Sequence, residues 1–366
     1  MSESYSQMLK IRFDEFENAE YEKNKKSVNI GIRELSKEAK RRAKRNECFI
    51  CQKQCSSFCN SHTVPQFCLK RIAINGHVYI SGLQKEYPIL GDDVGVSKAG
   101  TFHLICNTCD NTLFQDYENP DAYVAMPSNI MLAQIAMKNY LRLISKRLID
   151  RETHKIIYDK QTDPVRKYQQ LAQLITVPLD LKEYEDGYNR AKLATKGKHD
   201  DWYHMFFYTK LDYVVPVAFQ GSITLISGFD DEIINDIYNF DPNYRTKDLH
   251  ISIFPLKNET VIFAFIDSRN KVYRKFYKHL LTLPLEDQLA TINYIVLSNS
   301  EDIFIAKTEK INNEVMTNRA FLDVCQTTRI GKYDGGKKRL INTAAESFSL
   351  SKRNDIPNLL SKEYAL

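Results

Sequence analysis

The chain has 366 residues and a mass of 42.6 kDa, with 43% hydrophobic and 27% charged residues. This ordinary globular composition excludes a largely disordered chain and suffices for two or three domains of about 150 residues each. The sequence has no run of about 20 apolar residues to span a membrane, and its charged N-terminus lacks the apolar core of a signal peptide. We therefore expect a cytoplasmic protein without a membrane partner. The net charge of +5 is too small to identify a nucleic-acid-binding protein by itself.

Positive charge is concentrated in the first predicted region, residues 1–47. Residues 33–53 contain eight lysines and arginines but three glutamates, a net excess of five. Ile32, Leu35 and Ala39 form a short apolar stripe, which predicts a helix with its charged side chains in solvent. Such a helix is as typical of a solubilising segment as of one that contacts nucleic acid. The candidate phosphate-binding residues are Lys40, Arg41, Arg42, Lys44 and Arg45.

Two Cys-x-x-Cys pairs define the second predicted region, residues 48–126. They are Cys48 with Cys51, and Cys106 with Cys109. Each short loop presents two sulfur atoms, and four thiolates form the tetrahedral set of a structural Zn²⁺ site. In the reducing cytoplasm, eight cysteines are better explained as metal ligands or buried thiols than as disulfides. The sequence therefore predicts a zinc ion that supplies folding energy to this region.

Short strands are predicted between the two cysteine pairs. Alternating side chains at 77–80 and 101–105 are typical of strands, and glycines mark the turns. A short helix is expected after the second pair. A cysteine knuckle, a β-hairpin, a second knuckle and a helix, in this order, make up the treble-clef arrangement.

The other cysteines leave one alternative open. Four of them resemble the cysteine run of an iron–sulfur protein, although their spacing differs from the usual one: Cys48, Cys51, Cys55 and Cys59. A cluster bound there would leave Cys106 and Cys109 without a ligand role, which favours zinc. Cys68 and Cys325 are most simply buried thiols.

A Ser-His-x-x-Pro segment, with Ser61, His62 and Pro65, lies between the cysteine pairs. Together with the pairs, this segment resembles the HNH endonuclease family, which has a ββα-metal, treble-clef fold; the resemblance covers roughly residues 45–120. It implies that His62 is the general base that deprotonates a water molecule, while one divalent metal ion stabilises the leaving oxygen of the phosphodiester. A histidine can accept a proton at physiological pH, and a metal ion can stabilise the charge of the phosphodiester, so the chemistry agrees.

Oxygen ligands for the divalent ion follow the second cysteine pair. Mg²⁺ or Mn²⁺ accepts carboxylate and amide oxygens, and the candidates are Asp110, Asn111 and Glu118. Asn111 and Glu118 would share one face of a continuous helix, and the resemblance gives Asn111 the catalytic helix position. Asp110 is equally well explained as a residue that caps the helix. The family usually has an acidic or histidine ligand where this chain has Ser61, so a degenerate site that binds nucleic acid without cleaving it stays an alternative.

Three further regions complete the chain. Residues 127–200 have apolar residues at helical spacing and predict a helical connector, with two later amphipathic stretches near 164–176 and 180–195. Residues 201–328 mix strand and helix patterns and predict an α+β domain. The polar residues 329–366 predict a flexible tail. The strands expected in the α+β domain lie at 213–219, 223–226, 250–254 and 260–266.

The sequence thus predicts an α+β protein with a treble-clef zinc domain, a helical segment and a C-terminal α+β domain. We expect a metal-dependent HNH-like endonuclease that hydrolyses DNA, with RNA as an open alternative substrate. The C-terminal domain carries no motif with its own chemistry, so it is interpreted as a module for recognition, for a protein partner or for homo-oligomerisation. By analogy, such a pairing is typical of bacterial restriction and phage defence. The competing hypothesis is a non-catalytic zinc module that binds nucleic acid or another protein.

Overall fold

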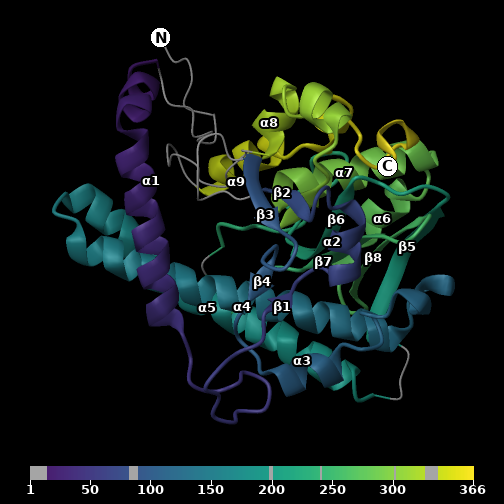
Figure 1. The fold of residues 1–366 in the computed structure, drawn as a ribbon, viewed down its shortest axis with the longest axis horizontal. Helices are drawn as coiled ribbons and strands as arrows, with labels where there is room; N and C mark the ends of the chain where they lie inside the picture. Colours follow the sequence, from purple (N-terminus) through teal and green to yellow (C-terminus); the bar gives the residue numbers. More distant parts are fainter. Residues whose placement is uncertain (1–14, 82–89, 198–200, 240, 301, 326–336) are drawn as a thin grey trace.

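A computed structural model describes residues 15–81, 90–197, 201–239, 241–300, 302–325 and 337–366. Its central element is a seven-stranded sheet with helices on both faces (Figure 1). All its neighbouring strands are antiparallel. The strands lie in the order β3 (Leu90–Gly95), β2 (His77–Ser81), β9 (Ile303–Ile305), β6 (Val217–Ile223), β7 (Leu249–Pro255), β8 (Thr260–Asp267) and β5 (Tyr203–Leu211). The predicted α+β class is confirmed.

The sheet draws its strands from distant parts of the sequence. The hairpin of β2 and β3 comes from the predicted region 48–126, whereas β5 to β9 come from 201–328. Strand β9 joins the two groups, because it pairs with β2 on one side and with β6 on the other. The cysteine region and the C-terminal region therefore share one sheet.

The strands predicted at 250–254 and 260–266 are confirmed, and they form a hairpin. Strands β7 and β8 pair along their length, and the backbone N–H of Leu256 donates to the carbonyl of Glu259 at 2.8 Å. The prediction of separate strands on the two sides of Gly221 is wrong, because β6 runs through this glycine. A Cβ atom at position 221 would lie 2.7 Å from the Phe219 ring, so the glycine serves close packing and not a turn.

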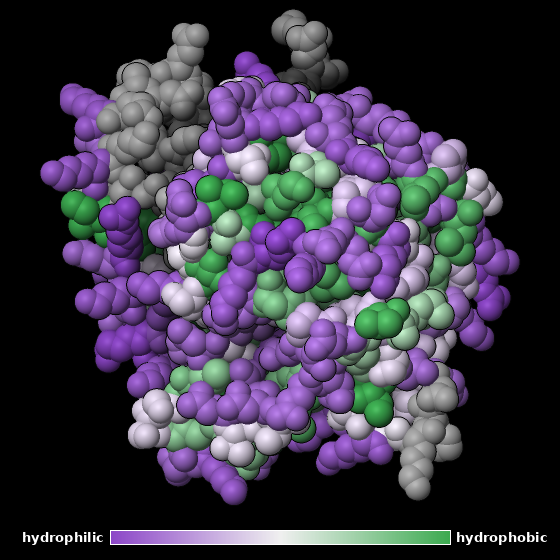
Figure 2. Space-filling model, turned by 45° about the vertical axis from the view of Figure 1, so that its right-hand side comes forward, coloured by the Kyte–Doolittle hydropathy of each residue, from purple (hydrophilic) through white to green (hydrophobic). Residues whose placement is uncertain are grey.

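Two layers of apolar side chains cover the two faces of the sheet, because successive strand residues point to opposite sides. Phe254 and Phe263 pack in one cluster with α2 (Gln66–Ile72) and the cysteine region. Ile253 and Ile262 pack in the other, with α6 (Arg274–Leu280), α7 (Leu285–Asn299) and α8 (Arg319–Cys325). Outside these layers, polar side chains dominate the face in Figure 2, with apolar residues scattered among them.

Two long helices, α4 (Asn129–Lys160) and α5 (Pro164–Ala194), pack against each other beside the sheet. Side-chain oxygens cap both starts: Ser128 accepts from the backbone N–H of Met131, and Asp163 accepts from that of Val165. The two amphipathic stretches predicted at 164–176 and 180–195 are one helix, which continues through Pro178. No helix in the described ranges combines the length and the apolar character needed to span a bilayer.

Contact between α4 and α5 requires a glycine at position 187. A Cβ atom there would overlap the Tyr140 ring, which a 2.9 Å hydrogen bond from its hydroxyl to Asp248 holds in place. We expect Gly187→Ala to lower the free energy of unfolding by about 1–3 kcal/mol, measured by urea denaturation. Gly31→Ala is the control, because no atom lies within 4 Å of its added Cβ. This exposed helix substitution should be neutral or stabilise by up to about 1 kcal/mol, and an equal loss in both variants would contradict the packing argument.

The end of the chain differs from the predicted flexible tail. Residues 329–336 lie outside the described residues, but α9 (Lys337–Ser347) and two short 3-10 helices follow them. Leu359 and Leu360 are fully buried, and the backbone N–H of Leu366 donates to Val214 at 2.8 Å. The polar composition of this segment conceals a few apolar residues that fix it to the core.

Candidate metal centre and the buried lysine beside it

The backbone brings the two cysteine pairs together. Cys48 and Cys51 lie in a tight turn in which the N–H of Gln52 donates to the carbonyl of Cys48 at 2.9 Å, with Gln52 in the left-handed region (φ 59°). Cys106 caps the helix α3 (Asn107–Leu113), and Cys109 lies in its first turn. Loop-to-loop hydrogen bonds, such as Phe49 N–H to the Leu104 carbonyl at 3.0 Å, place the turn beside this helix.

The four predicted cysteine ligands form one cluster. Their sulfur atoms all lie within 4.8 Å of one another, and those of Cys51 and Cys106 are 3.9 Å apart. A tetrahedral zinc ion with bonds of about 2.3 Å holds its sulfurs about 3.8 Å apart, so the cluster fits such an ion. The prediction that these cysteines come together is confirmed, and they could hold a metal ion such as zinc.

Backbone N–H groups prepare Cys48 to be a thiolate. Burial alone would raise the pKa of Cys48, but hydrogen bonds from the backbone at Cys51, Cys106 and Ile50 outweigh it and lower the pKa to about 7. In one of these bonds, the N–H of Cys106 donates to the Cys48 sulfur at 3.3 Å. A metal ligand must be deprotonated, so this turn favours the form that binds.

The remaining cysteines lie outside this cluster. The Cys55 thiol donates to the Lys53 carbonyl at 3.3 Å, and the Cys59 thiol donates to Asp110 at 3.1 Å. The iron–sulfur alternative is therefore not supported, because Cys55 and Cys59 do not join the metal-binding set found among the described residues. Cys68 and Cys325 are buried thiols, as predicted.

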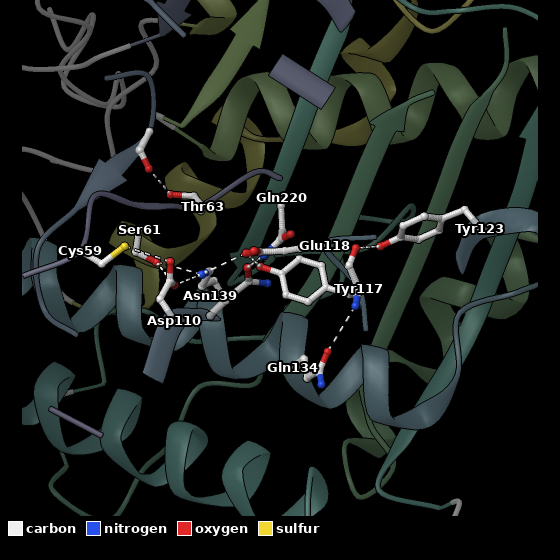
Figure 3. Close-up of polar contacts among 12 residues, drawn as sticks. Cys59, Ser61, Thr63, Asp110, Tyr117, Glu118, Tyr123, Gln134, Asn139 and Gln220 are labelled. Atoms are coloured by element: carbon white, nitrogen blue, oxygen red, sulfur yellow. Dashed lines mark hydrogen bonds and ion pairs between the residues drawn. The ribbon is translucent and has the colours of Figure 1, made fainter. Parts of the chain in front are cut away.

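A buried lysine lies between two of the predicted oxygen ligands. The Lys138 ammonium, from α4, is 2.5 Å from an oxygen of Asp110 and 3.1 Å from an oxygen of Glu118. It also donates to the Ser61 hydroxyl at 2.8 Å. We call Lys138, Ser61, Asp110 and Glu118 the lysine cluster. In Figure 3 the Ser61 and Asp110 side chains point toward each other, and Glu118 approaches from the other side.

The ammonium at the centre of the lysine cluster is shielded from solvent. The Lys138 side chain is 0% exposed, and its ammonium lies over the Phe114 ring at 4.0 Å from the centroid. Burial alone would raise the pKa of Asp110, but the charge and hydrogen bond of Lys138 outweigh it and lower this pKa. Burial raises the pKa of Glu118, and the longer contact with Lys138 does not offset this effect. Asp110 is therefore the main counter-ion of the buried ammonium.

Neighbouring polar groups fix the segment after α3 to α4. The Gln134 side-chain oxygen accepts from the backbone N–H of Tyr117 at 3.3 Å, and the Tyr123 hydroxyl donates to the Tyr117 carbonyl at 2.7 Å (Figure 3). The Tyr117 hydroxyl in turn donates to Glu118 at 3.2 Å. Gln220 of β6 donates to Asn139 of α4 at 3.0 Å, which extends the polar contacts to the sheet.

Asn111 does not join the two carboxylates. Its side chain is exposed, whereas that of the preceding Asp110 is directed inward. Helix α3 ends at Leu113, so the predicted seven-residue relation between Asn111 and Glu118 on one helix is wrong. Glu118 reaches the cluster from the turn that follows the helix, where its N–H donates to the Phe114 carbonyl at 3.1 Å.

His62 lies on a short strand, β1 (Ser61–His62), which pairs with β4 (Thr101–Phe102). Adjacent strand residues point to opposite sides, so the His62 side chain faces away from that of Ser61. Its Nε2 atom is 3.1 Å from the Val96 carbonyl, and no hydrogen bond or ion pair joins it to the segment 110–118 within the described chain. Burial lowers the pKa of the half-buried imidazole, so the ring is neutral at pH 7.

The predicted basic residues lie at the C-terminal end of α1 (Glu15–Ala43), shortly before Cys48. All five are exposed, namely Lys40, Arg41, Arg42, Lys44 and Arg45. Arg41 and Arg42 both bind the Glu38 carboxylate, at 2.8 and 2.7 Å. The Arg45 guanidinium lies 5.5 Å from the centroid of the Phe49 ring.

Lys138 is the site residue that sequence reasoning missed. One signal was available: Lys138 is the only charged residue between Ile135 and Leu141, a segment of the predicted helix in which most residues are apolar. A buried lysine needs a counter-ion, which would have directed attention to the carboxylates after the second cysteine pair.

No family model, curated protein or solved structure matches this chain. Its function is therefore argued from the geometry of the cysteine cluster, the lysine cluster and the basic end of α1.

Proposed function

We propose that this protein is a zinc-stabilised, nucleic-acid-binding protein whose HNH-like site does not hydrolyse phosphodiesters. The observation that carries the proposal is the Lys138 ammonium, which contacts Ser61, Asp110 and Glu118. Ser61 occupies the position before the histidine where the family usually has a metal ligand, and the two carboxylates are the remaining candidate ligands. A positive charge already fills this position, and it repels a divalent cation at short range.

The order of the elements supports the HNH-like, treble-clef interpretation. The first cysteine pair precedes β1, β4 pairs with β1, and the second cysteine pair begins α3. The four sulfurs would hold Zn²⁺, which would tie the turn at Cys48 to the start of the helix. In this role the zinc ion is structural, because four cysteine ligands leave no open position for substrate.

The nucleic-acid part of the proposal is supported by the exposed basic residues beside the cysteine cluster. Lys40 and Lys44 lie close enough to His103 to lower its pKa, after the larger effect of burial. Positive charge on α1 thus extends to the surface next to the second cysteine pair. Such a surface attracts the phosphate backbone independently of base sequence.

A second candidate function, DNA hydrolysis with His62 as base, is favoured by one observation. If Nε2–H donates to the Val96 carbonyl, this bond orients a neutral imidazole and leaves Nδ1 as proton acceptor. This function also requires Mg²⁺ or Mn²⁺ near His62. Asp110 and Glu118 could act as ligands of that ion only if Lys138 moved away.

A plasmid-nicking assay with Mg²⁺ or Mn²⁺, run beside a DNA-binding assay at several salt concentrations, tests the two candidates. We expect binding that weakens as salt rises, without nicking. Cleavage that disappears in His62→Ala, with folding and zinc content unchanged, would establish the hydrolase instead. If the protein neither binds nor cleaves DNA, the protein-interaction alternative is favoured.

A further inference from the structure

One face of α1 carries a line of basic side chains. The line consists of five residues at intervals of seven, four, three and four: Lys26, Arg33, Lys37, Lys40 and Lys44. Lys44 comes directly after the last helical residue, Ala43. These intervals keep side chains on one face of a helix with 3.6 residues per turn. All five residues are exposed. We call this line the basic stripe.

The opposite face of the helix holds α1 on the molecule. Ala39 is fully buried, Leu35 is half-buried, and α1 packs against α4. Figure 1 shows α1 at one edge of the molecule, across the long helices. The basic stripe is thus presented to solvent by a helix that is anchored on its other side.

Arg41 and Arg42, two arginines of the same helix outside the basic stripe, both bind Glu38. Hydrogen bonds from Arg41 and then Arg42 lower the pKa of Glu38 to about 2, so its carboxylate is ionised at neutral pH. It therefore offsets part of the charge of both guanidinium groups. The lysines at 37, 40 and 44 form the part of the stripe closest to the cysteine cluster.

We propose that the basic stripe binds the phosphate backbone of a nucleic-acid duplex, with α1 along a groove. This inference rests on the proposed nucleic-acid-binding function and names its binding element and substrate form. From Lys26 to Lys44 the stripe spans about 27 Å; neighbouring charges are about 5–6 Å apart, except for Lys26 and Arg33, which are about 10 Å apart. A helix about 10–12 Å wide matches the major groove of about 12 Å. Among the α1 residues whose exposure the structure describes, no exposed one is aromatic and able to stack on unpaired bases, which favours a duplex over a single strand.

The test compares two triple variants of equal charge by fluorescence anisotropy. The probe is a duplex of about 20 base pairs, longer than the stripe, with a single strand of equal length alongside. We expect Lys37→Gln/Lys40→Gln/Lys44→Gln to bind the duplex about 10–100-fold more weakly and to reduce the slope against log salt by about 2–3. The control, Lys271→Gln/Arg274→Gln/Lys278→Gln, removes three exposed charges around α6 and should retain affinity within about threefold.

Glu38→Gln is a variant that should strengthen duplex binding, whereas the triple variant of the stripe should weaken it. Releasing Arg41 and Arg42 from their carboxylate should tighten duplex binding by about 3–10-fold at low salt. Equal losses of duplex affinity in the two triple variants would overturn the proposed role of the basic stripe but leave the proposed function standing. A wild-type protein that binds neither duplex nor single strand would overturn both. Preference for the single strand, or for vesicles with anionic headgroups over the duplex, would overturn the duplex inference.

Discussion

Substitution of Cys48 or Cys109 by serine is expected to abolish the soluble, folded protein. Structural zinc contributes on the order of 10–16 kcal/mol in small zinc modules, which equals or exceeds the total stability of a typical domain. The cysteine cluster also fixes the turn at Cys48 to α3, which is only seven residues long. Size-exclusion chromatography and circular dichroism would record the loss, and elemental analysis of the wild type should give one zinc ion per chain.

Cys55→Ser is the matched control for this prediction. Its thiol lies in the same loop but outside the four-sulfur cluster and donates to the Lys53 carbonyl, so zinc content and folding should be retained. If the Cys48 and Cys109 variants remained folded after losing the metal, the structural role of the cluster would be disproved.

Replacement of Lys138 by methionine is expected to lower the free energy of unfolding by about 3–5 kcal/mol at pH 7. Methionine fills a similar volume but leaves Asp110 and Glu118 facing each other without the buried positive charge. Urea denaturation measures the change. Lys160→Met, at the exposed end of the same helix, should alter stability by less than about 0.5 kcal/mol.

The loss in the Lys138 variant should depend on pH. In the wild type the pKa of Asp110 is lowered, so its stabilising contribution is present at neutral pH and is lost as the pH falls through this lowered value. In the variant, both carboxylates can relieve their burial by binding protons. The difference between wild type and variant should therefore shrink from pH 7 toward about pH 4. A constant difference would show that lost packing, and not charge, is responsible.

Addition of Mn²⁺ to the same variant tests whether the ammonium stands in place of a metal ion. Without Lys138, the oxygens of Ser61, Asp110 and Glu118 offer a hard cation a ligand set. Millimolar Mn²⁺ should recover part of the lost stability in Lys138→Met but leave the wild type unchanged. No recovery would mean that these oxygens are only a structural counter-charge.

Short-range patterns in the sequence predicted the cysteine cluster and the adjacent strands β7 and β8. Both depend on local geometry: a tight turn presents two thiols, and a four-residue connection joins two adjacent strands. The cation at the predicted oxygen ligands could not be identified in this way, because Lys138 is 28 residues from Asp110 and comes from another helix. The sequence placed the two carboxylates near one another but did not show which positive charge they bind.

Gly221 and the end of the chain were misjudged for a related reason. A glycine between apolar residues is typical of a turn, but here the Phe219 ring takes the space of its missing side chain. The polar segment 329–366 contains Leu359 and Leu360, whose burial depends on a surface made by residues far earlier in the chain. Tertiary packing determines the structure at Gly221 and in this segment, and composition alone does not predict such packing.

The place of β9 in the sheet has a consequence for biosynthesis. Ile305 pairs with Tyr79 and also with Val217, so the first hairpin has no partner until residue 305 has left the ribosome. At about 5–20 residues per second, the 210 residues from Gly95, the end of β3, to Ile305 take roughly 10–40 s to synthesise. During this interval the β2 edge and the apolar residues around it stay open to wrong partners. We therefore expect folding during translation to depend on chaperones, because the short strand β9 is synthesised last and has to insert between two groups of strands that are synthesised earlier.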